Sequence, residues 1–325
     1  MITDIVPECE DPAPGSTHLL DLPIGARNSR SVYRSVLNDA SYTHGLLAPE
    51  SRQPTACIGS HRPALVRSIM FVVEMRFCGD LAFFLPRAQR SEAHVRRVLR
   101  EKTGVKDVIE ACGVPHVEVD LIVATDADSQ PRAEDLDWQV DSSTTLEIYP
   151  VPAPSNVQPE APRLQNRFRE RFVADGHLGK LARNLRLLGL DTAYERDADD
   201  RRLLAIMSGE QRALLTRDRR LLMHSVVRDG FCPRSSNSEV QTREVLRRFD
   251  LHRCPSALVP WRRCLRCNGI LQTVPKRDVL DPLADEPLTL RFFDEFRRCV
   301  DCGQIYWRGT HFDKLSTRLA RLLDS

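Results

Sequence analysis

The sequence contains no long apolar segment. Its longest apolar stretch, near residues 69–73, is far shorter than the roughly 20 residues that a membrane-spanning helix requires. No apolar core of a secretory signal peptide follows the N-terminus, where the acidic residues are Asp4, Glu8, Glu10 and Asp11. These two absences predict a soluble protein that stays in the cytoplasm and has no membrane partner.

Lysine is also scarce: five of the 47 basic residues are lysine, and the others are arginine. The 45 acidic residues nearly balance them, which gives a net charge of +2. The charges are unevenly distributed: residues 163–263 contain 22 basic and 13 acidic residues, whereas residues 1–68 contain six and seven. The central segment is therefore where we expect a polyanion to bind.

Proline is concentrated in two places. Seven of the 21 prolines lie within residues 1–68, where no helical or strand periodicity persists, and five more lie between Pro150 and Pro162. Such segments are typical of disordered chain and of semi-rigid linkers. The expected organisation is a disordered or loosely ordered extension (1–68), a first domain (69–151), a Pro-rich linker (152–165), a second domain (166–260) and a C-terminal region (261–325).

Residues 69–151 alternate between strand and helix patterns. Strands are expected at 71–77, 117–123 and 145–149, with a short partner strand at 83–85. Residues 105–111 have apolar side chains at helical spacing and are followed by Gly113 and Pro115, which predicts a helix that stops there. Strands that flank one helix within about 80 residues indicate a small α+β roll.

The second domain has a different rhythm. Buried strands are expected at 172–174, 190–194 and 213–216, and helices at 178–188, after Asp199 and at 238–249. Strands that alternate with helices in this way predict a parallel α/β sheet with flanking helices.

Acidic residues fall at corresponding places in this pattern. Asp175 and Asp218 each follow a predicted strand, and Asp199 and Asp200 open a predicted helix. Because ligand sites form outside the carboxyl ends of parallel strands, these side chains are expected to share one edge of the sheet. Converging carboxylates suit Mg²⁺ or Mn²⁺, which can orient water for phosphodiester hydrolysis. The alternative for each single residue is a helix cap.

Basic side chains accompany the acidic ones. Lys180 and Arg183 follow Asp175, and Arg217 and Arg219 flank Asp218. They are candidates for holding phosphate groups of a nucleic acid, although any one of them could instead lie on a solvated helix face.

Four of the ten cysteines form two close pairs, Cys264–Cys267 and Cys299–Cys302. Two such CxxC pairs supply the four thiolates of a tetrahedral zinc site. A closed four-thiolate site is structural rather than catalytic, so we expect a zinc ribbon in residues 261–325. Gly269 and Gly303 follow the pairs and permit the tight turns that these knuckles need.

These motifs together resemble a known family. The segments FVADGHLGKLARNLRLLGLDT, RDADDRRLL and ALLTRDRRLL, followed by the CxxC pairs and CGQIYWRGTHFDKL, look like the Mut-seven C-terminal RNase domain family, from about Phe168 to Leu319. The segments VKDVIEACGVPHVEVDLIV and LEIYPV resemble the ubiquitin-like domain often fused ahead of it. The resemblance implies a PIN-like α/β domain, preceded by a ubiquitin-like α+β roll and followed by a zinc ribbon.

The resemblance also implies a function. It implies metal-dependent cleavage of RNA, with Asp175, the pair Asp199 and Asp200, and Asp218 at the family's acidic positions. Ser236 and Asn237 occupy the region where many PIN nucleases place a fourth acid. The alternative is therefore a non-catalytic RNA-binding or adaptor protein whose ubiquitin-like domain recruits a protein partner. That domain ends without a Gly-Gly pair, which excludes a conjugation or sulfur-carrier role for it.

Overall fold

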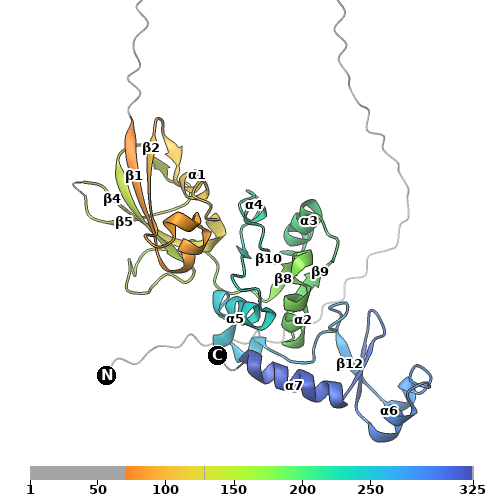
Figure 1. The fold of residues 1–325 in the computed structure, drawn as a ribbon. Coiled ribbons are helices and arrows are strands. Elements are labelled where there is room, and N and C mark those ends of the chain that lie inside the picture. Colours follow the sequence, from red (N-terminus) through yellow and green to blue (C-terminus); the bar gives the residue numbers. More distant parts are fainter. Residues whose placement is uncertain (1–69, 128, 324–325) are drawn as a thin grey trace, which may run out of the picture. The chain divides into compact units, whose positions relative to one another are not determined.

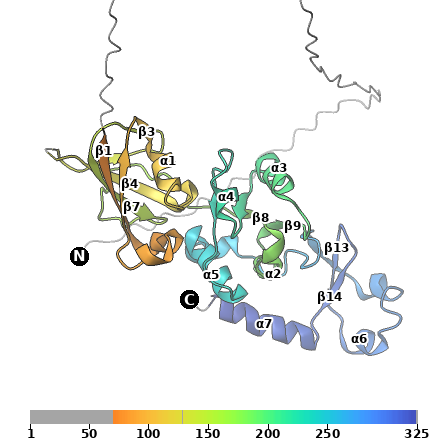
Figure 2. The ribbon, with the colours of Figure 1, turned by 45° about the horizontal axis from the view of Figure 1, so that its top comes forward.

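The computed structural model describes residues 70–127 and 129–323 (Figures 1 and 2). The extension expected at residues 1–68 lies outside the described residues. Within the described part of the chain, no helix is both long and apolar enough to cross a membrane. Three main sheets, of five, four and three strands, organise the described chain into a roll, an α/β region and a C-terminal ribbon.

The roll is built on a five-stranded sheet with the order β2–β1–β7–β4–β5. Strands β1 and β7 pair in parallel, and the other neighbours are antiparallel. The bounds are β1 Phe71–Phe77, β2 His94–Leu99, β4 Val119–Thr125, β5 Arg132–Glu134 and β7 Thr144–Pro150. A separate pair joins β3 (Thr103–Gly104) to β6 (Gln139–Val140).

Alternation of side chains explains how the roll buries its core. In β1, every second residue from Phe71 to Phe77 is buried, and the residues between them are more exposed. Helix α1 (Val105–Glu110) buries Val105, Val108 and Ile109 in the same core, as the helical spacing of these residues predicts. The sequence thus predicts correctly that this part of the chain is a roll of strands packed on one helix.

The expected short strand at 83–85 is wrong. Residues Gly79–Phe84 form a 3₁₀ helix, and β2 is the antiparallel partner of β1 instead. Phe83 and Phe84 lie with their rings edge to face, 5.4 Å apart, and Phe84 is buried. The apolar character of this segment therefore reflects burial of a helical turn rather than a strand.

The segment that was expected to be a Pro-rich linker has neither helix nor strand between Ala153 and Gln165, but it packs against the roll. The amide of Ala153 donates to the Asp120 carboxylate and the amide of Leu164 donates to the Asp120 carbonyl, both at 2.9 Å. The segment is therefore held at both of its ends by β4, and it does not run as a free spacer.

The α/β region contains a parallel sheet with the order β11–β10–β8–β9. Helices connect the strands in the expected alternation. The bounds are β8 Arg171–Ala174, α2 Gly179–Leu187, β9 Asp191–Tyr194, α3 Asp200–Glu210, β10 Ala213–Leu215, α4 Arg219–Leu222, β11 Gly230–Phe231 and α5 Ser238–Arg248. Helix α2 ends where Gly189 adopts a φ of +90°, which glycine tolerates best.

Both faces of this sheet are covered. Phe172 and Leu215 pack with the leucines of α2 and with Val245 of α5. Val173 and Leu214 point to the opposite face and belong to the cluster that includes Leu203 of α3. The views in Figures 1 and 2 show α2 and α5 side by side.

The ribbon has three antiparallel strands, β12 (Leu271–Val274), β13 (Phe296–Cys299) and β14 (Ile305–Trp307). Helix α6 (Pro287–Phe292) lies in the long insertion between the cysteine pairs. Helix α7 (Thr310–Leu323) follows the ribbon and packs beside α5 (Figure 1). Leu322 is fully buried in the core of the α/β region.

Candidate active site and cysteine cluster

Two of the predicted acidic residues are joined at the sheet edge. Asp175 directly follows β8, and Asp218 follows the neighbouring parallel strand β10. The Thr216 hydroxyl donates to Asp175 Oδ2 at 2.6 Å and accepts the amide hydrogen of Asp218 at 3.0 Å. Thr216 is fully buried, so it fixes the position of both acidic residues from below.

Asp200 joins these two residues in one open groove. The groove is also lined by Ala198, His177, Arg217, Arg219 and Arg220. None of the ion pairs among the described residues involves Asp175, Asp200 or Asp218, although arginines line the same groove. The Asp218 Oδ1 atom caps α4 by accepting the amides of Arg220 and Leu221. Three carboxylates without a cationic partner therefore face a common space.

Asp199 lies outside this groove. Its Oδ1 atom accepts the Arg202 amide at 2.7 Å and caps α3, and it lines a neighbouring hollow together with Asp197. A shift of one residue at the helix start thus separates a capping side chain from one that faces the groove.

The donor set of the groove suits a hard divalent cation, because carboxylate oxygens are the ligands that Mg²⁺ and Mn²⁺ prefer. Among the described residues, the carboxylates do not converge as tightly as the cysteines discussed below. Mg²⁺ usually retains several water ligands and binds through one or two carboxylates, so it does not require three protein ligands to converge tightly.

A strongly basic pocket adjoins the acidic groove, and His177 and Arg217 line both. Lys180 and Arg183 of α2, which the sequence analysis singled out, belong to it. Arg196 and Arg266 complete its basic lining, and the remaining lining includes Tyr194, Ser236 and Gln241. The cavity measures about 700 Å³, which is large enough for part of a polynucleotide backbone.

Arg219 is placed differently from the other basic residues. It lines the acidic groove, but its Nη1 atom donates to the Phe84 carbonyl at 2.6 Å. Its guanidinium also lies 5.3 Å from the centre of the Phe84 ring. These contacts hold the side chain, so it has less freedom to follow a phosphate than Lys180 or Arg183.

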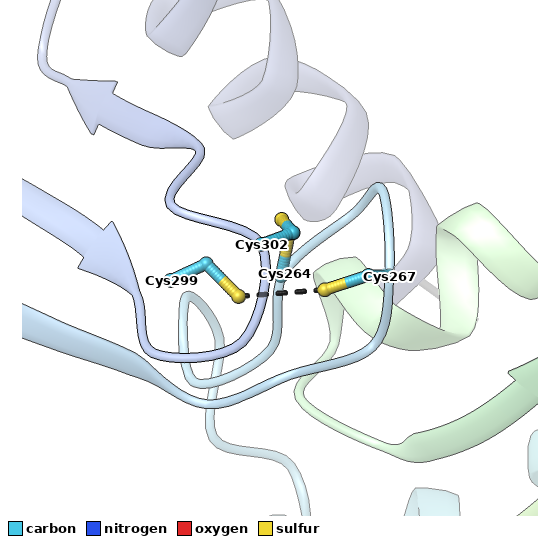
Figure 3. A group of neighbouring side chains, drawn as sticks. All are labelled: Cys264, Cys267, Cys299 and Cys302. Carbon is cyan, nitrogen blue, oxygen red and sulfur yellow. Dashed lines mark hydrogen bonds between the residues drawn. The ribbon is translucent and has the colours of Figure 1, made fainter. Parts of the chain in front are cut away.

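The four cysteines converge as the spacing predicts. Their sulfur atoms all lie within 4.8 Å of one another, and Figure 3 shows the two pairs facing each other. The Sγ–Sγ distances are 3.7 Å for Cys264–Cys302 and 3.4 Å for Cys267–Cys299. Zinc–sulfur bonds of about 2.3 Å in a tetrahedron separate the sulfurs by about 3.8 Å, so the cluster is compatible with a zinc ribbon.

Neighbouring groups tune one of these thiols. Burial alone would raise the pKa of Cys264, but the Tyr306 hydroxyl, 3.2 Å from its sulfur, and nearby backbone amides lower that pKa to about 7. Gly269 is required at the turn, because a Cβ atom there would lie 2.7 Å from Cys299 Sγ. The lowered pKa favours the thiolate form of Cys264, and the absence of a side chain at Gly269 leaves room for the Cys299 sulfur.

The first knuckle, Cys264–Cys267, is docked on the α/β region. Arg186, which is buried in α2, donates to the carbonyls of Leu265 and Arg266 at 3.3 and 3.0 Å. Asn268 bonds the Asp191 carboxylate and the Thr192 amide. The knuckle therefore presents Arg266 to the basic pocket from a fixed position.

Asp191 sits at the centre of this docking. Burial would raise its pKa, but hydrogen bonds from Arg212 and Asn268 lower it instead. The Arg212 Nη1 atom lies 2.6 Å from Asp191, and its side chain is 6% exposed. Breaking one partner of a buried ion pair strands the other charge.

We therefore expect Asp191→Ala to lower the free energy of unfolding by about 3 kcal/mol at neutral pH. The matched control, Glu195→Ala, removes the partner of Arg202 in an exposed pair and should cost less than about 1 kcal/mol. Urea denaturation followed by circular dichroism measures both. Because the pKa of Asp191 is lowered on folding, its contribution should fade as the pH drops through the acidic range. Equal losses in the two variants would contradict this account.

Several residues of the site were not singled out from the sequence. Thr216 and Arg266 could have been found from the sequence by their position beside predicted site residues: Thr216 lies two residues before Asp218, and Arg266 lies within a CxxC pair. Tyr194 and Arg196 could not, since their place in the pocket depends on how β9 lies beside β8.

Comparison with known families agrees with these features. Residues 170–319 match the Mut7-C RNAse domain, and residues 70–155 match the Mut7-C ubiquitin domain. No curated protein and no solved structure matches the chain. The ubiquitin match covers the roll, and the RNAse match covers the α/β region and the ribbon. The chain therefore contains a Mut7-C RNAse domain, preceded by a Mut7-C ubiquitin domain.

Proposed function

We propose that this protein is a cytoplasmic ribonuclease that uses Mg²⁺ or Mn²⁺ to cleave phosphodiester bonds of RNA. The observation that carries the proposal is the groove in which Asp175, Asp200 and Asp218 share one edge of the parallel sheet beside a basic pocket. A divalent cation bound there would polarise the phosphate and activate water. The cysteine cluster would hold a structural zinc ion.

The residues of the groove have distinct roles in this proposal. Asp175, Asp200 and Asp218 would hold the catalytic metal, and Asp199 would only cap α3. Thr216 would orient Asp175 through its hydrogen bond to Oδ2. Lys180, Arg183 and Arg217 would bind phosphates of the RNA strand and set its direction across the acidic edge. Arg219 would steady the groove wall more than it binds RNA.

A second function is favoured by one observation. Where many related nucleases are expected to carry a fourth acid, Ser236 lines the basic pocket and Asn237 caps α5 through the amides of Glu239 and Val240. A protein with this feature could bind RNA without cleaving it. It would act as an adaptor whose ubiquitin-like domain recruits a protein partner.

A cleavage assay separates the two functions. End-labelled single-stranded RNA is incubated with zinc-loaded protein and with Mg²⁺, with Mn²⁺ or with neither. The nuclease proposal expects products with an added divalent metal and none without it. Retention of RNA in a binding assay, with no cleavage in any arm, would favour the adaptor.

The basic pocket leads to a prediction about salt. For a single strand, each phosphate contact contributes a slope of roughly 0.7 to the log–log dependence of affinity on salt. We expect Arg183→Ala to reduce that slope by up to about 0.7 and to weaken all RNA sequences equally. Arg247→Ala, an exposed residue of α5 outside the pocket, should leave the slope unchanged. Fluorescence anisotropy at several salt concentrations measures both. An unaltered slope for Arg183→Ala would move the RNA path away from α2.

A further inference from the structure

The ribbon contains a pocket that is separate from the acidic groove and the basic pocket. It measures about 310 Å³, and aromatic side chains and arginines line it, namely Trp261, Phe296, Arg297, Tyr306, Trp307 and Arg308. The chain has three tryptophans, and two of them are in this pocket. We call it the tryptophan pocket.

Strand register places part of its lining on one face of the ribbon. Arg297 lies opposite Thr273 on β12 and opposite Tyr306 on β14. Residues directly opposite one another in antiparallel strands share a face, so these three side chains form one surface. Arg297 and Thr273 are exposed, and Tyr306 is half-buried.

The two tryptophans line the pocket and are held there by specific contacts, Trp307 from the face of β14 opposite to that of Tyr306. The Trp261 carbonyl accepts a hydrogen bond from Arg297 Nη1 at 2.7 Å, which ties the segment before the first knuckle to β13. A Cβ atom at residue 309 would lie 2.8 Å from Trp307 Nε1, so Gly309 allows the indole to rest against the backbone. Both indoles are half-buried, which leaves ring surface accessible.

The chemistry of the lining identifies the class of ligand. Half-buried indole rings offer flat surfaces on which a planar ring can stack, and arginine adds a cation beside it. Of the two arginines in the pocket, Arg308 pairs with Glu295 at 3.3 Å. Arg297 is therefore the cation that would lie beside a stacked ring. A nucleotide offers both a planar base and a neighbouring phosphate. The volume of the pocket is at the lower end of the range for small-molecule sites, which suits a single base.

We propose that the tryptophan pocket is a base-stacking subsite for single-stranded RNA. The inference deepens the proposed function and rests on RNA being the substrate. Tyr306 links this subsite to the cysteine cluster, because it lines the pocket and its hydroxyl contacts Cys264 Sγ. RNA bound at the acidic groove would thus gain a second contact that depends on bases rather than on phosphates.

Tryptophan fluorescence tests this directly. In a Trp138→Phe variant, the emission comes from Trp261 and Trp307 alone. The zinc-loaded variant is titrated with an eight-nucleotide oligoadenylate, and with an abasic oligomer of equal length, without added Mg²⁺ or Mn²⁺ so that nothing is cleaved. We expect saturable quenching by oligoadenylate and at least about fivefold weaker binding of the abasic oligomer, because stacking adds roughly 1–3 kcal/mol per base.

Two further variants complete the test. Trp307→Leu and Trp261→Leu should each weaken oligoadenylate binding at least about fivefold and leave abasic binding unchanged, since phosphate contacts do not need the indoles. Circular dichroism and zinc content identify a variant that fails to fold. In that case, the binding measured for the other variant tests the subsite. Equal affinity for the two oligomers, or no change in emission, would overturn the subsite. If the subsite binds oligoadenylate but the protein cleaves no RNA with Mg²⁺ or Mn²⁺, the nuclease proposal is overturned and the subsite is not.

Discussion

Asp218→Asn is expected to slow metal-dependent RNA cleavage by at least about 100-fold. Loss of groups that merely orient a metal ligand typically costs 10–100-fold, so loss of a charged ligand should cost more. The substitution keeps the shape of the side chain and its Oδ1 acceptor, which caps α4 through Arg220 and Leu221. Asparagine caps a helix as well as aspartate does, so the fold should survive. Single-turnover cleavage of labelled RNA measures the change.

Asp197→Asn provides the matched control. Asp197 lies in the loop between β9 and α3, three residues before Asp200, but it lines the neighbouring hollow. Its variant should cleave within about twofold of the unsubstituted rate, because it removes a similar charge from outside the groove. A rate for Asp218→Asn that matches the Asp197→Asn rate would contradict the assignment of the groove.

Zinc removal is expected to unfold the ribbon while the α/β region stays folded. The ribbon has a small core of its own, centred on Val279, Leu283, Phe296 and Ile305. In regions this small, metal binding supplies much of the folding free energy, about 10–16 kcal/mol for zinc-finger peptides. Cys264→Ser removes one ligand and should have the same effect. Hydrogen exchange should become fast in β12, β13 and β14 and stay slow in β8 and β10.

The zinc prediction extends to RNA. Since Arg266 reaches the basic pocket from the first knuckle, the zinc-free protein should bind RNA more weakly, with a salt slope reduced by roughly 0.7. Cys232→Ser, at a buried cysteine outside the cluster, is the control and should change neither zinc content nor slope. Freshly purified protein without zinc, or slow exchange in a zinc-free ribbon, would contradict the account.

The elements of the α/β region could be predicted because local and global signals agree there. The leucines of α2 and the apolar runs of β8 and β10 have the period and length of their elements, and Gly189 ends α2. Asp175 and Asp218 could be located at one edge because the sheet is parallel. The roles of Asp199 and Asp200 could not be distinguished from the sequence, since an aspartate at either position can cap a helix and the choice depends on where the first turn begins.

Other features depend on tertiary contacts that leave no periodic signal. The segment 83–85 is apolar enough for a strand, but burial of Phe84 in a 3₁₀ helix satisfies it instead. The Pro-rich segment looks like a spacer, but the Asp120 carboxylate and carbonyl tie it to the roll. The basic pocket and the tryptophan pocket combine residues from several elements, so neither could be assembled from the sequence alone.

Manganese binding measured by electron paramagnetic resonance tests the central claim most directly. Zinc-loaded protein is titrated with Mn²⁺, and the same is done with an Asp175→Asn/Asp218→Asn double variant. The account predicts at least one Mn²⁺ site that the double variant loses, with half-saturation at the Mn²⁺ concentration that gives half-maximal RNA cleavage. Identical Mn²⁺ binding by the two proteins would contradict the account. So would half-maximal cleavage at a Mn²⁺ concentration that differs from the one that half-saturates the site.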